Sequence, residues 1–374
     1  TNVPRNKIII LQNDKKSQIK SSNYLDSGRL PIVDQSSNLI CGYTNDLTKR
    51  YSEEIPVIVF GDHTLHLKYI DFEFATGADG TQILRPLNRD DLCKYIFYVI
   101  LRETQIMGSE GYKRHLKILK ERLVPYSDNY AEQRKIASIL TSVDEVIENT
   151  QKQIEKLQDL KKAVMNDLLT RGISHTEFKD SELGRIPVEW NLHVLEKVSS
   201  IVMGQSPDSN TYNEERYGLP FFQGKADFGS RSPQVKYWCS IPIKVSPKNS
   251  ILLSVRAPVG DINLSTEKCC IGRGLASITA ISAELEFLYQ FLLYSKPKFE
   301  ALGQGSTFEA INGAELRRFS IKIPPLPEQK KIASILTSID KNIEEKQRKL
   351  QKTEFLKKSL MQDLLTGKVR VRVN

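Results

Sequence analysis

Residues 132–170 read EQRKIASILTSVDEVIENTQKQIEKLQDLKKAVMNDLLT, and residues 328–366 read EQKKIASILTSIDKNIEEKQRKLQKTEFLKKSLMQDLLT. At a constant offset of 196 residues, 23 of these 39 positions are identical. One long segment therefore occurs twice in the chain, and each copy follows a different block of sequence. This organisation predicts a protein built from two modules.

Apolar residues recur in both copies at the alternating spacing of three and four residues that marks one face of a paired helix. In the first copy they are Ile136, Leu140, Val143, Ile147, Ile154, Leu157, Val164 and Leu168, with Thr150 and Lys161 in the two remaining places. In the second copy they are Ile332, Leu336, Ile339, Ile343, Leu350, Leu360 and Leu364. Neither copy contains Gly or Pro, and Gly172 and Gly367 follow where helices commonly end. The sequence predicts two long helices in a left-handed coiled coil.

The two helices can pair within one chain or between two chains. A helix of 39 residues is about 58 Å long, and the intervening segment is long enough to carry the chain back along it. Matching sequences at both positions would make an internal antiparallel pair pseudo-two-fold symmetric, and we favour this arrangement. Self-association of two chains through the coiled coil remains the alternative.

The variable blocks are distant copies of each other as well. LPIVDQSSN at 30–38 matches LPFFQGKAD at 219–227, and Gly77 falls opposite Gly272. Short Val- and Ile-rich runs bounded by Gly, Pro and Asp predict strands, and apolar runs at 92–101 and 285–294 predict helices. We therefore expect an α+β protein with two similar mixed α/β domains. The predicted divisions are 1–131, 132–172, 173–327, 328–368 and a tail at 369–374.

Composition limits the class of protein. The formal net charge of +9 suggests a polyanionic partner, although ordinary solubility explains it equally well. No run approaches the roughly 18 apolar residues of a membrane helix, and the start TNVPRNKIIILQND does not resemble a signal peptide. The five cysteines form no C-x-x-C pair, which argues against a zinc ribbon or a disulfide framework. We expect a cytoplasmic protein that does not bind membranes.

Sequence patterns of catalytic centres are missing. The chain has no G-x-x-x-x-G-K-[ST] loop, no H-E-x-x-H and no [DNS]-P-P-[YFW] run of the kind that holds a target adenine. Asp62, His63 and His66 are the best metal-like group, but His63 and His66 would point to opposite faces of a strand. The adjacent Cys269 and Cys270 are expected to pack in a core. We therefore predict a non-catalytic protein with no metal and no cofactor of its own.

Several phrases together resemble the specificity subunit of type I restriction-modification systems. They are GRIPVEWNLHVLEKV at 184–198, GQSP at 204–207, IPPLPEQKKIASIL at 323–336, LKKSLMQDLLTGKVRV at 356–371, FGDHT at 60–64 and FATGADG at 74–80. The resemblance covers essentially the whole chain and implies two target recognition domains, each followed by a long helix of an antiparallel coiled coil. Each domain would read one half of a bipartite site in double-stranded DNA.

The same resemblance implies partner subunits. Two adenine-N6 methyltransferase subunits would dock on the assembly, and restriction or motor subunits would join them. S-adenosylmethionine and ATP would belong to those partners. The coiled coil would then set the spacer between the half-sites, with about 17 base pairs as the upper limit for a rod of about 58 Å.

Polar residues in the variable blocks are candidate DNA contacts, because Arg can bind guanine or phosphate, Gln can read adenine, and glycine-rich turns can hold phosphate. The candidates in the first block are Lys15, Lys16, Lys20, Gln35, His63, Thr64, Lys113 and Arg114. Those in the second block are Gln205, Ser206, Gln223, Lys225, Arg256, Arg273, Gln304, Ser306 and Thr307. Surface ion pairs and plain turns are the alternative explanation for each.

The first block departs from the family pattern. It lacks the I-P-x-x-W start that Ile186, Pro187 and Trp190 form in the second block, which puts its first strand in doubt. VPYSDNYAEQ at 124–133 also replaces the proline-rich hinge. Two other functions remain open. A coiled-coil adaptor for proteins would show no salt-dependent DNA affinity, and a self-contained DNA enzyme would act without partners.

Overall fold

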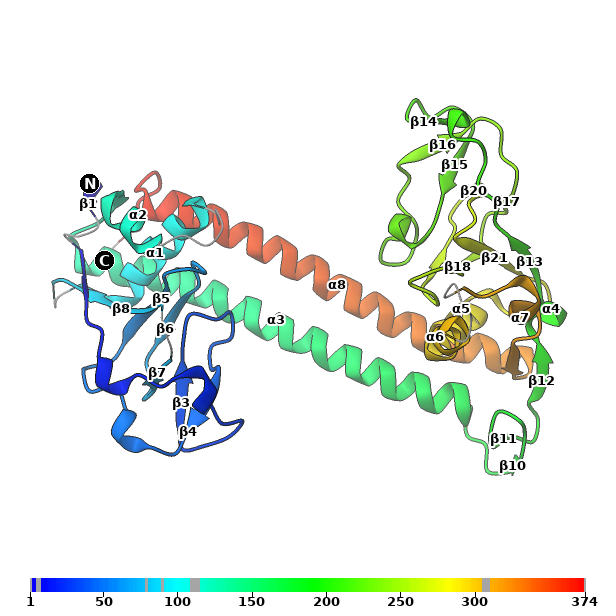
Figure 1. Ribbon diagram of the computed structural model, residues 1–374, viewed down its shortest axis with the longest axis horizontal. Helices are drawn as coiled ribbons and strands as arrows, with labels where there is room; N and C mark the ends of the chain where they lie inside the picture. The colour runs from blue at the N-terminus through cyan, green and yellow to red at the C-terminus, as the bar shows by residue number, and fades with distance from the viewer. Residues whose placement is uncertain are drawn as a thin grey trace. The chain divides into compact units, whose positions relative to one another are not determined.

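The computed structural model describes residues 2–4, 8–77, 80–88, 91–107, 115–304 and 310–372. The chain divides into two compact units. Unit 1 comprises residues 1–152 and 348–374, and unit 2 comprises residues 153–347. Each unit therefore contains one variable block together with part of both long helices (Figure 1).

The repeated segments form the two long helices, α3 at Tyr130–Thr170 and α8 at Leu326–Leu365. In unit 1, Lys357 Nζ of α8 lies 2.6 Å from Asp144 Oδ1 of α3. In unit 2, Lys161 Nζ of α3 lies 2.6 Å from Asp340 Oδ1 of α8. The residue numbers rise along α3 while they fall along α8, so the predicted antiparallel pair within one chain is confirmed (Figure 1).

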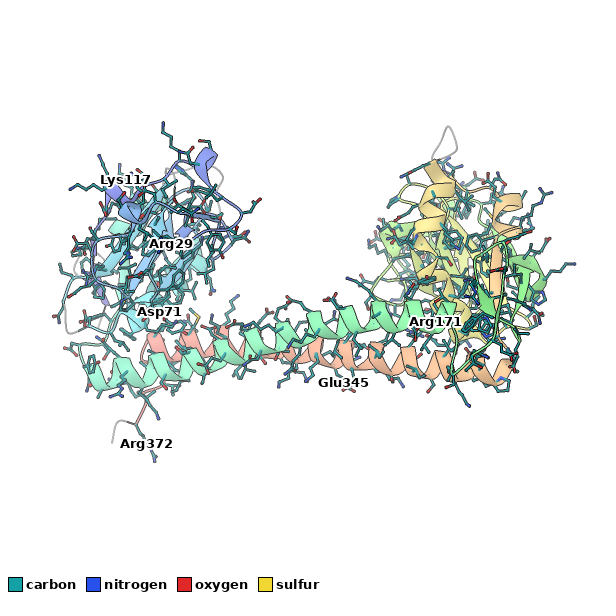
Figure 2. All side chains as sticks on the ribbon, turned by 90° about the horizontal axis from the view of Figure 1, so that it is seen from below. Arg29, Asp71, Lys117, Arg171, Glu345 and Arg372 are labelled. Atoms are coloured by element: carbon teal, nitrogen blue, oxygen red, sulfur yellow. The ribbon has the colours of Figure 1, made fainter. Side chains whose placement is uncertain are left out.

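Most residues predicted for the seam between the helices are buried or half-buried. Ile136, Leu140, Ile332 and Leu336 are at most 2% exposed. Thr150, predicted to fill a seam position without an apolar side chain, is also buried, and its hydroxyl donates to the Val146 carbonyl at 2.6 Å. Glu345 of α8, labelled in Figure 2, is an exposed side chain outside this seam.

Unit 1 contains short strands and two further helices. The strands are β1 (Asn2–Pro4), β2 (Ile9–Leu11), β3 (Leu30–Val33), β4 (Gly42–Thr44), β5 (Val57–Gly61), β6 (Leu67–Ile70), β7 (Ala75–Thr76), β8 (Thr81–Pro86) and β9 (Leu123–Pro125). The helices are α1 (Cys93–Met107) and α2 (His115–Glu121). One sheet has the order β2-β8-β5-β6 and another the order β4-β3-β7.

Unit 2 repeats this arrangement with a larger second sheet. Its strands are β10 (Phe178–Lys179), β11 (Ile186–Pro187), β12 (Asn191–Val194), β13 (Ser199–Met203), β14 (Tyr212–Asn213), β15 (Leu219–Phe222), β16 (Tyr237–Cys239), β17 (Val245–Ser246), β18 (Ile251–Ser254), β19 (Ile262–Leu264), β20 (Cys269–Ile271), β21 (Leu275–Ala280) and β22 (Ser320–Ile323). Its helices are α4 (Leu195–Val198), α5 (Leu285–Tyr294), α6 (Lys296–Gln304) and α7 (Gly313–Arg317). The sheets have the orders β13-β21-β18-β19 and β14-β16-β15-β20-β17.

Alternating side chains explain how each four-stranded sheet is covered on both faces. In unit 1, Ile58 and Phe60 pack in the cluster that contains α1 and the ends of the long helices, whereas Val57 and Val59 pack with Val33 of β3. In unit 2, Ile251 and Leu253 face α5, and Leu252 packs with Phe222 of β15. Each unit therefore has one core against the helices and a second core between its two sheets, the second sheet being β4-β3-β7 in unit 1 and β14-β16-β15-β20-β17 in unit 2.

The structure resolves the doubt about the start of the first block. Strand β1 pairs with β9, with Val3 opposite Val124. The counterpart in unit 2 is the pairing of β12 with β22, in which Asn191 lies opposite Ile323. A first strand therefore forms in unit 1 without the I-P-x-x-W sequence, because backbone pairing does not require those side chains.

Within the described part of the chain, no helix has the length and apolar character needed to cross a bilayer. The same residues contain no group of three His, Cys, Asp or Glu side chains suited to holding a metal ion. All five cysteines are free thiols. Cys269 and Cys270 are fully buried on β20, as predicted, and burial raises the pKa of each thiol to about 12.

Candidate nucleic-acid interface

A pair of parallel strands brings polar residues to one edge of one sheet in each unit, the β4-β3-β7 sheet in unit 1 and the β14-β16-β15-β20-β17 sheet in unit 2. In unit 1, Val33 of β3 pairs with Thr76 of β7, and in unit 2, Phe222 of β15 pairs with Ile271 of β20. Adjacent parallel strands end at the same edge, so the residues that follow them lie together. Asp34 thus lies beside Gly77, and Gln223 beside Gly272, which agrees with the predicted equivalence of Gly77 and Gly272.

In unit 2 this edge borders an open pocket of about 350 Å³. Its lining residues are Ser206, Tyr212, Phe221, Gln223, Asp227, Tyr237 and Arg273. The rings of Tyr212 and Phe221 stack with their centroids 4.5 Å apart and form an apolar wall. The Gln223 amide nitrogen donates to the Ser206 hydroxyl at 2.8 Å, and the backbone N–H of Arg273 donates to the same oxygen at 3.3 Å. The structure therefore brings together the predicted residues Ser206, Gln223 and Arg273.

Glycines allow the backbones at this edge to approach closely. A Cβ on Gly204 would lie 2.1 Å from the Gly272 carbonyl oxygen, and a Cβ on Gly274 would lie 2.6 Å from the Gln223 carbonyl oxygen. Glycine is required where backbones meet at such distances. The G-Q-S-P sequence thus places Ser206 against Gln223, while Gln205 beside it is exposed.

In unit 1 the corresponding edge is organised around Gln35. Its backbone carbonyl accepts a hydrogen bond from the Thr64 hydroxyl at 2.6 Å and lies 3.2 Å from His66 Nδ1. The Gln35 side-chain oxygen accepts from the backbone N–H of His63 at 3.4 Å. The predicted residues Gln35, His63 and Thr64 therefore lie together, with His66 as an additional polar side chain.

A buried ion pair supports this edge of unit 1. Lys68 is only 6% exposed, and its Nζ donates to the Asp34 carbonyl at 2.7 Å and lies 3.9 Å from Asp34 Oδ1. Burial lowers the pKa of Lys68, and the Asp34 charge opposes this shift. Burial would raise the pKa of Asp34, but the hydrogen bond from the Ser36 backbone N–H, together with Cys41 and the Lys68 charge, lowers the pKa of that carboxyl. Asp34 occupies the place of Gln223 in unit 2, so the two edges differ in charge.

Asp62 has a structural role. It is 7% exposed, and its Oδ1 accepts a hydrogen bond from the backbone N–H of Leu116 at 2.7 Å, in the first turn of α2. Such a side chain caps the helix by satisfying an otherwise unpaired N–H group. Asp62, His63 and His66 form no metal-binding group among the described residues.

The remaining predicted residues lie apart from these two edges or carry other contacts. Lys15, Lys16 and Lys20 are exposed at or beside short 3-10 turns. Lys225 Nζ lies 2.5 Å from Asp261 Oδ2, so this carboxylate partly compensates its charge. Arg256 is exposed after β18, and Gln304 is exposed at the end of α6. Lys113, Arg114, Ser306 and Thr307 lie outside the described residues.

Sequence reasoning missed several residues of the two edges. Tyr212, Asp227 and Tyr237 line the unit 2 pocket, and Asp34 and Lys68 support the unit 1 edge. No short motif marks these residues. The available signal was their position in the aligned blocks, because LPIV and LPFF each lead directly into the edge.

Two similar units with different edge residues define a recognition protein with two domains. The model of the type I restriction modification DNA specificity domain matches residues 8–159 and 187–354. The putative type I restriction enzyme MjaX specificity subunit of Methanocaldococcus jannaschii is 43% identical over 295 residues, which are 78% of this chain and 67% of that protein. The MjaVIII specificity subunit of the same organism is 29% identical over 314 residues, covering 76% and 71%.

Solved structures are similar over nearly the whole chain. A chain from the structure of an assembled type I R-M system is 25% identical, with a TM-score of 0.59 and coverage of 91% and 92%. The S subunit from M. genitalium shares the fold, with 16% identity, a TM-score of 0.68 and coverage of 97% and 95%. The present chain belongs to the family of type I restriction-modification specificity subunits. These subunits are the DNA-recognition components of their systems rather than the catalytic ones.

Proposed function

We propose that the variable blocks of units 1 and 2 are recognition domains that each read one half of an asymmetric bipartite DNA site. The observation that carries this proposal is the pair of equivalent edges with different chemistry. Unit 2 presents Gln223 and Arg273, and unit 1 presents Gln35, Thr64 and His66. Two domains with the same fold but different edge residues would select two different half-sites, so the whole site would not be a palindrome.

The chemistry of the unit 2 pocket suits the edges of bases. An Arg guanidinium can bind the O6 and N7 atoms of guanine, and a Gln amide can bind N6 and N7 of adenine. Arg273 is exposed, and the described residues provide no ion-pair partner for it. Exposed Lys15, Lys16 and Lys20 in unit 1 would contact phosphates instead, which positions DNA without selecting sequence.

The helix pair would set the unread spacer and bind two adenine methyltransferase subunits. The near-identity of the repeated helices supports two equivalent docking surfaces. Leu160 of α3 and Leu356 of α8 are equivalent at the offset of 196, and both are 49% exposed. S-adenosylmethionine would be bound by the methyltransferase subunits and ATP by a restriction subunit. This assembly would act on genomic DNA in the cytoplasm.

Exchange of edge residues tests independent reading. Arg273→Ala, expressed with the methyltransferase subunit, is expected to relax selection at one half-site and to cost about 1–3 kcal/mol of base discrimination. Thr64→Val with His66→Ala is expected to alter the other half-site only. The readout is long-read sequencing of methylated adenines in a plasmid library with both half-sites randomised. A variant that changes both half-sites would refute independent reading.

A further inference from the structure

An aspartate of α3 joins the recognition domain of unit 1 to the helix pair. Asp144 Oδ2 accepts a hydrogen bond from the Tyr98 hydroxyl at 2.7 Å, and its Oδ1 lies 2.6 Å from Lys357 Nζ. Tyr98 belongs to α1 of the recognition domain and is fully buried, whereas Lys357 belongs to α8. The two oxygens of one carboxylate therefore hold the domain and the opposite helix at the same time.

The same arrangement recurs in unit 2 at the equivalent residue of the other helix. Asp340 Oδ2 accepts a hydrogen bond from the Gln290 amide at 2.7 Å, and its Oδ1 lies 2.6 Å from Lys161 Nζ. Gln290 belongs to α5 of the second recognition domain and is fully buried. Asp144 and Lys161 of the first repeat correspond at the offset of 196 to Asp340 and Lys357 of the second.

A second polar contact precedes each aspartate along the same helix face. Gln133 Oε1 accepts from the backbone N–H of Leu92 at 2.9 Å, and Gln329 Oε1 accepts from the backbone N–H of Glu284 at 2.8 Å. In both units the glutamine lies 11 residues before the aspartate, which is about three helical turns. Each recognition domain thus makes hydrogen bonds at two points on one helix face, in addition to the apolar core that it shares with the long helices.

The apolar core holds each domain against the helices, and two directional polar contacts restrict its orientation more than one would. The glutamines are 1–2% exposed and contact backbone at the start of α1 or α5. The aspartates contact side chains six residues further along, at Tyr98 and Gln290. Hydrogen bonds to a charged group are among the stronger ones in proteins, and both aspartates are mostly shielded from solvent.

The contacts of Asp144 in unit 1 and of Asp340 in unit 2, here called the two junctions, differ in the hydrogen bonds that surround them. In unit 1, the Tyr98 hydroxyl is also 3.1 Å from the Thr141 hydroxyl. In unit 2, the residue equivalent to Thr141 is Thr337, and its hydroxyl finds no hydrogen-bond partner among the described residues. Gln290 Oε1 is likewise buried without a partner there. The orientation of the second domain therefore depends more heavily on Asp340 than that of the first depends on Asp144.

We infer that Asp144 and Asp340 are positioning residues that couple the orientation of each recognition domain to the pairing of the long helices, and thereby restrict the spacer length that the protein accepts. This inference rests on the proposed function. Neither residue would contact DNA, so the bases selected at each half-site would not depend on them. Loss of one aspartate contact would loosen the orientation of the domain on the helix pair, while the glutamine contact and the shared apolar core keep it attached.

The test uses Asp144→Ala and Asp340→Ala in the complex with the methyltransferase subunit. Each variant is assayed on plasmids that carry the preferred half-sites with the spacer lengthened or shortened by one base pair. The wild-type complex is expected to methylate plasmids with one spacer length at least about tenfold more than the others. Each variant is expected to show a preference of less than about threefold, because one charge-assisted contact is lost. Asp340→Ala should show the larger change. The matched control is Glu148→Gln, which removes an exposed ion pair with Lys152 inside α3.

Further variants separate positioning from stability. Tyr98→Phe removes the domain contact of Asp144 together with the hydrogen bond to Thr141, and Lys357→Met removes the contact between Asp144 and the opposite helix. Both should broaden spacer tolerance, and both remain informative if Asp144→Ala fails to fold. Asp144→Asn keeps an acceptor for Tyr98 and should fall between wild type and Asp144→Ala. A lower melting temperature with unchanged spacer preference in these folded variants would overturn the inference.

Hydrogen exchange distinguishes failure of this inference from failure of the proposed function. If wild type selects no bipartite site, the proposed function is wrong. The junction is then tested by amide hydrogen exchange of the protein without DNA. Faster amide exchange in α1 of Asp144→Ala, without faster exchange in α5, would still support orientation through the junction. Unchanged exchange in both helices would contradict it.

Discussion

Replacing Trp190 by alanine is expected to lower the free energy of unfolding of unit 2 by about 3–5 kcal/mol, the range for removing a large buried aromatic side chain. Trp190 is fully buried and packs in the cluster that contains Leu169 of α3 and Ile332 of α8. Its indole N–H donates to Glu328 Oε2 at 3.0 Å. The variant would therefore leave both a cavity and an incompletely bonded carboxylate at the start of α8.

Glu328 makes the loss larger than packing alone predicts. Its Oε1 accepts from the backbone N–H of Ile173 at 2.8 Å and lies 2.9 Å from His175 Nε2, so one carboxylate holds the segment that follows α3. Urea unfolding followed by circular dichroism measures the effect. The matched control is Trp238→Ala, because Trp238 lies half-buried on β16 with Arg216 beside its ring. If Trp190→Ala and Trp238→Ala lowered the free energy of unfolding equally, the contacts of Trp190 and Glu328 with the segment after α3 would not stabilise unit 2 as described.

Gly204→Ala is expected to reduce methylation of the bipartite site by roughly one to two orders of magnitude, which corresponds to about 1–3 kcal/mol of packing strain. A Cβ at this position would lie 2.1 Å from the Gly272 carbonyl oxygen and 2.8 Å from that of Leu275. Both contacts are to backbone, so neither can be relieved by a side-chain rotation. The end of β13 would move, and Ser206 would no longer support Gln223 and Arg273.

Gly224→Ala provides the control within the same edge. A Cβ on Gly224 would meet no atom within 4 Å, and the residue has an extended backbone with φ −175°. This variant should methylate the site as wild type does. Long-read sequencing of methylated adenines measures both variants under the same expression conditions. Comparable losses from Gly204→Ala and Gly224→Ala would show that the close approach of backbones at Gly204 does not organise the recognition edge.

The long helices were predictable because a single local rule determines them. Apolar residues at spacings of three and four produce a continuous seam, and the sequence repeat indicates that both copies obey it. The observed helices begin close to the predicted starts at 132 and 328, since α3 begins at Tyr130 and α8 at Leu326. The internal pairing followed from the repeat and from the length of the intervening segment.

The equivalence of the variable blocks was also predictable, although only at the level of position. LPIV and LPFF share Leu-Pro and an apolar character but differ in side-chain shape, and both form the strand that pairs in parallel with the segment before Gly77 or Gly272. Strand pairing uses backbone groups, so different sequences can form the same arrangement of strands. The partners within each strand pair could not be read from sequence, because they are separated by more than 40 residues.

The contacts that organise the two edges could not be predicted from the sequence, for a different reason. Ser206 bonds Gln223 only because Gly204 and Gly272 let three chain segments meet, and no local pattern encodes that meeting. Lys225 stays a predicted DNA contact, and its ion pair with Asp261 could not be read from the sequence because the partner lies 36 positions away. In the sequence Asp62 groups with His63 and His66 as a weak metal-like cluster, and its burial and its bond to the Leu116 N–H make it a cap of α2.

The most direct test of the central claim is sequencing of methylated adenines in the host genome with and without the gene for this chain. The account predicts that deletion abolishes methylation at one asymmetric motif with two specified halves and an unspecified spacer of fixed length. Restoring the gene with Arg273→Ala should return methylation with one half relaxed. Methylation that is identical with and without the gene, in cells shown to produce the methyltransferase subunit, would contradict the account and favour a protein-binding adaptor.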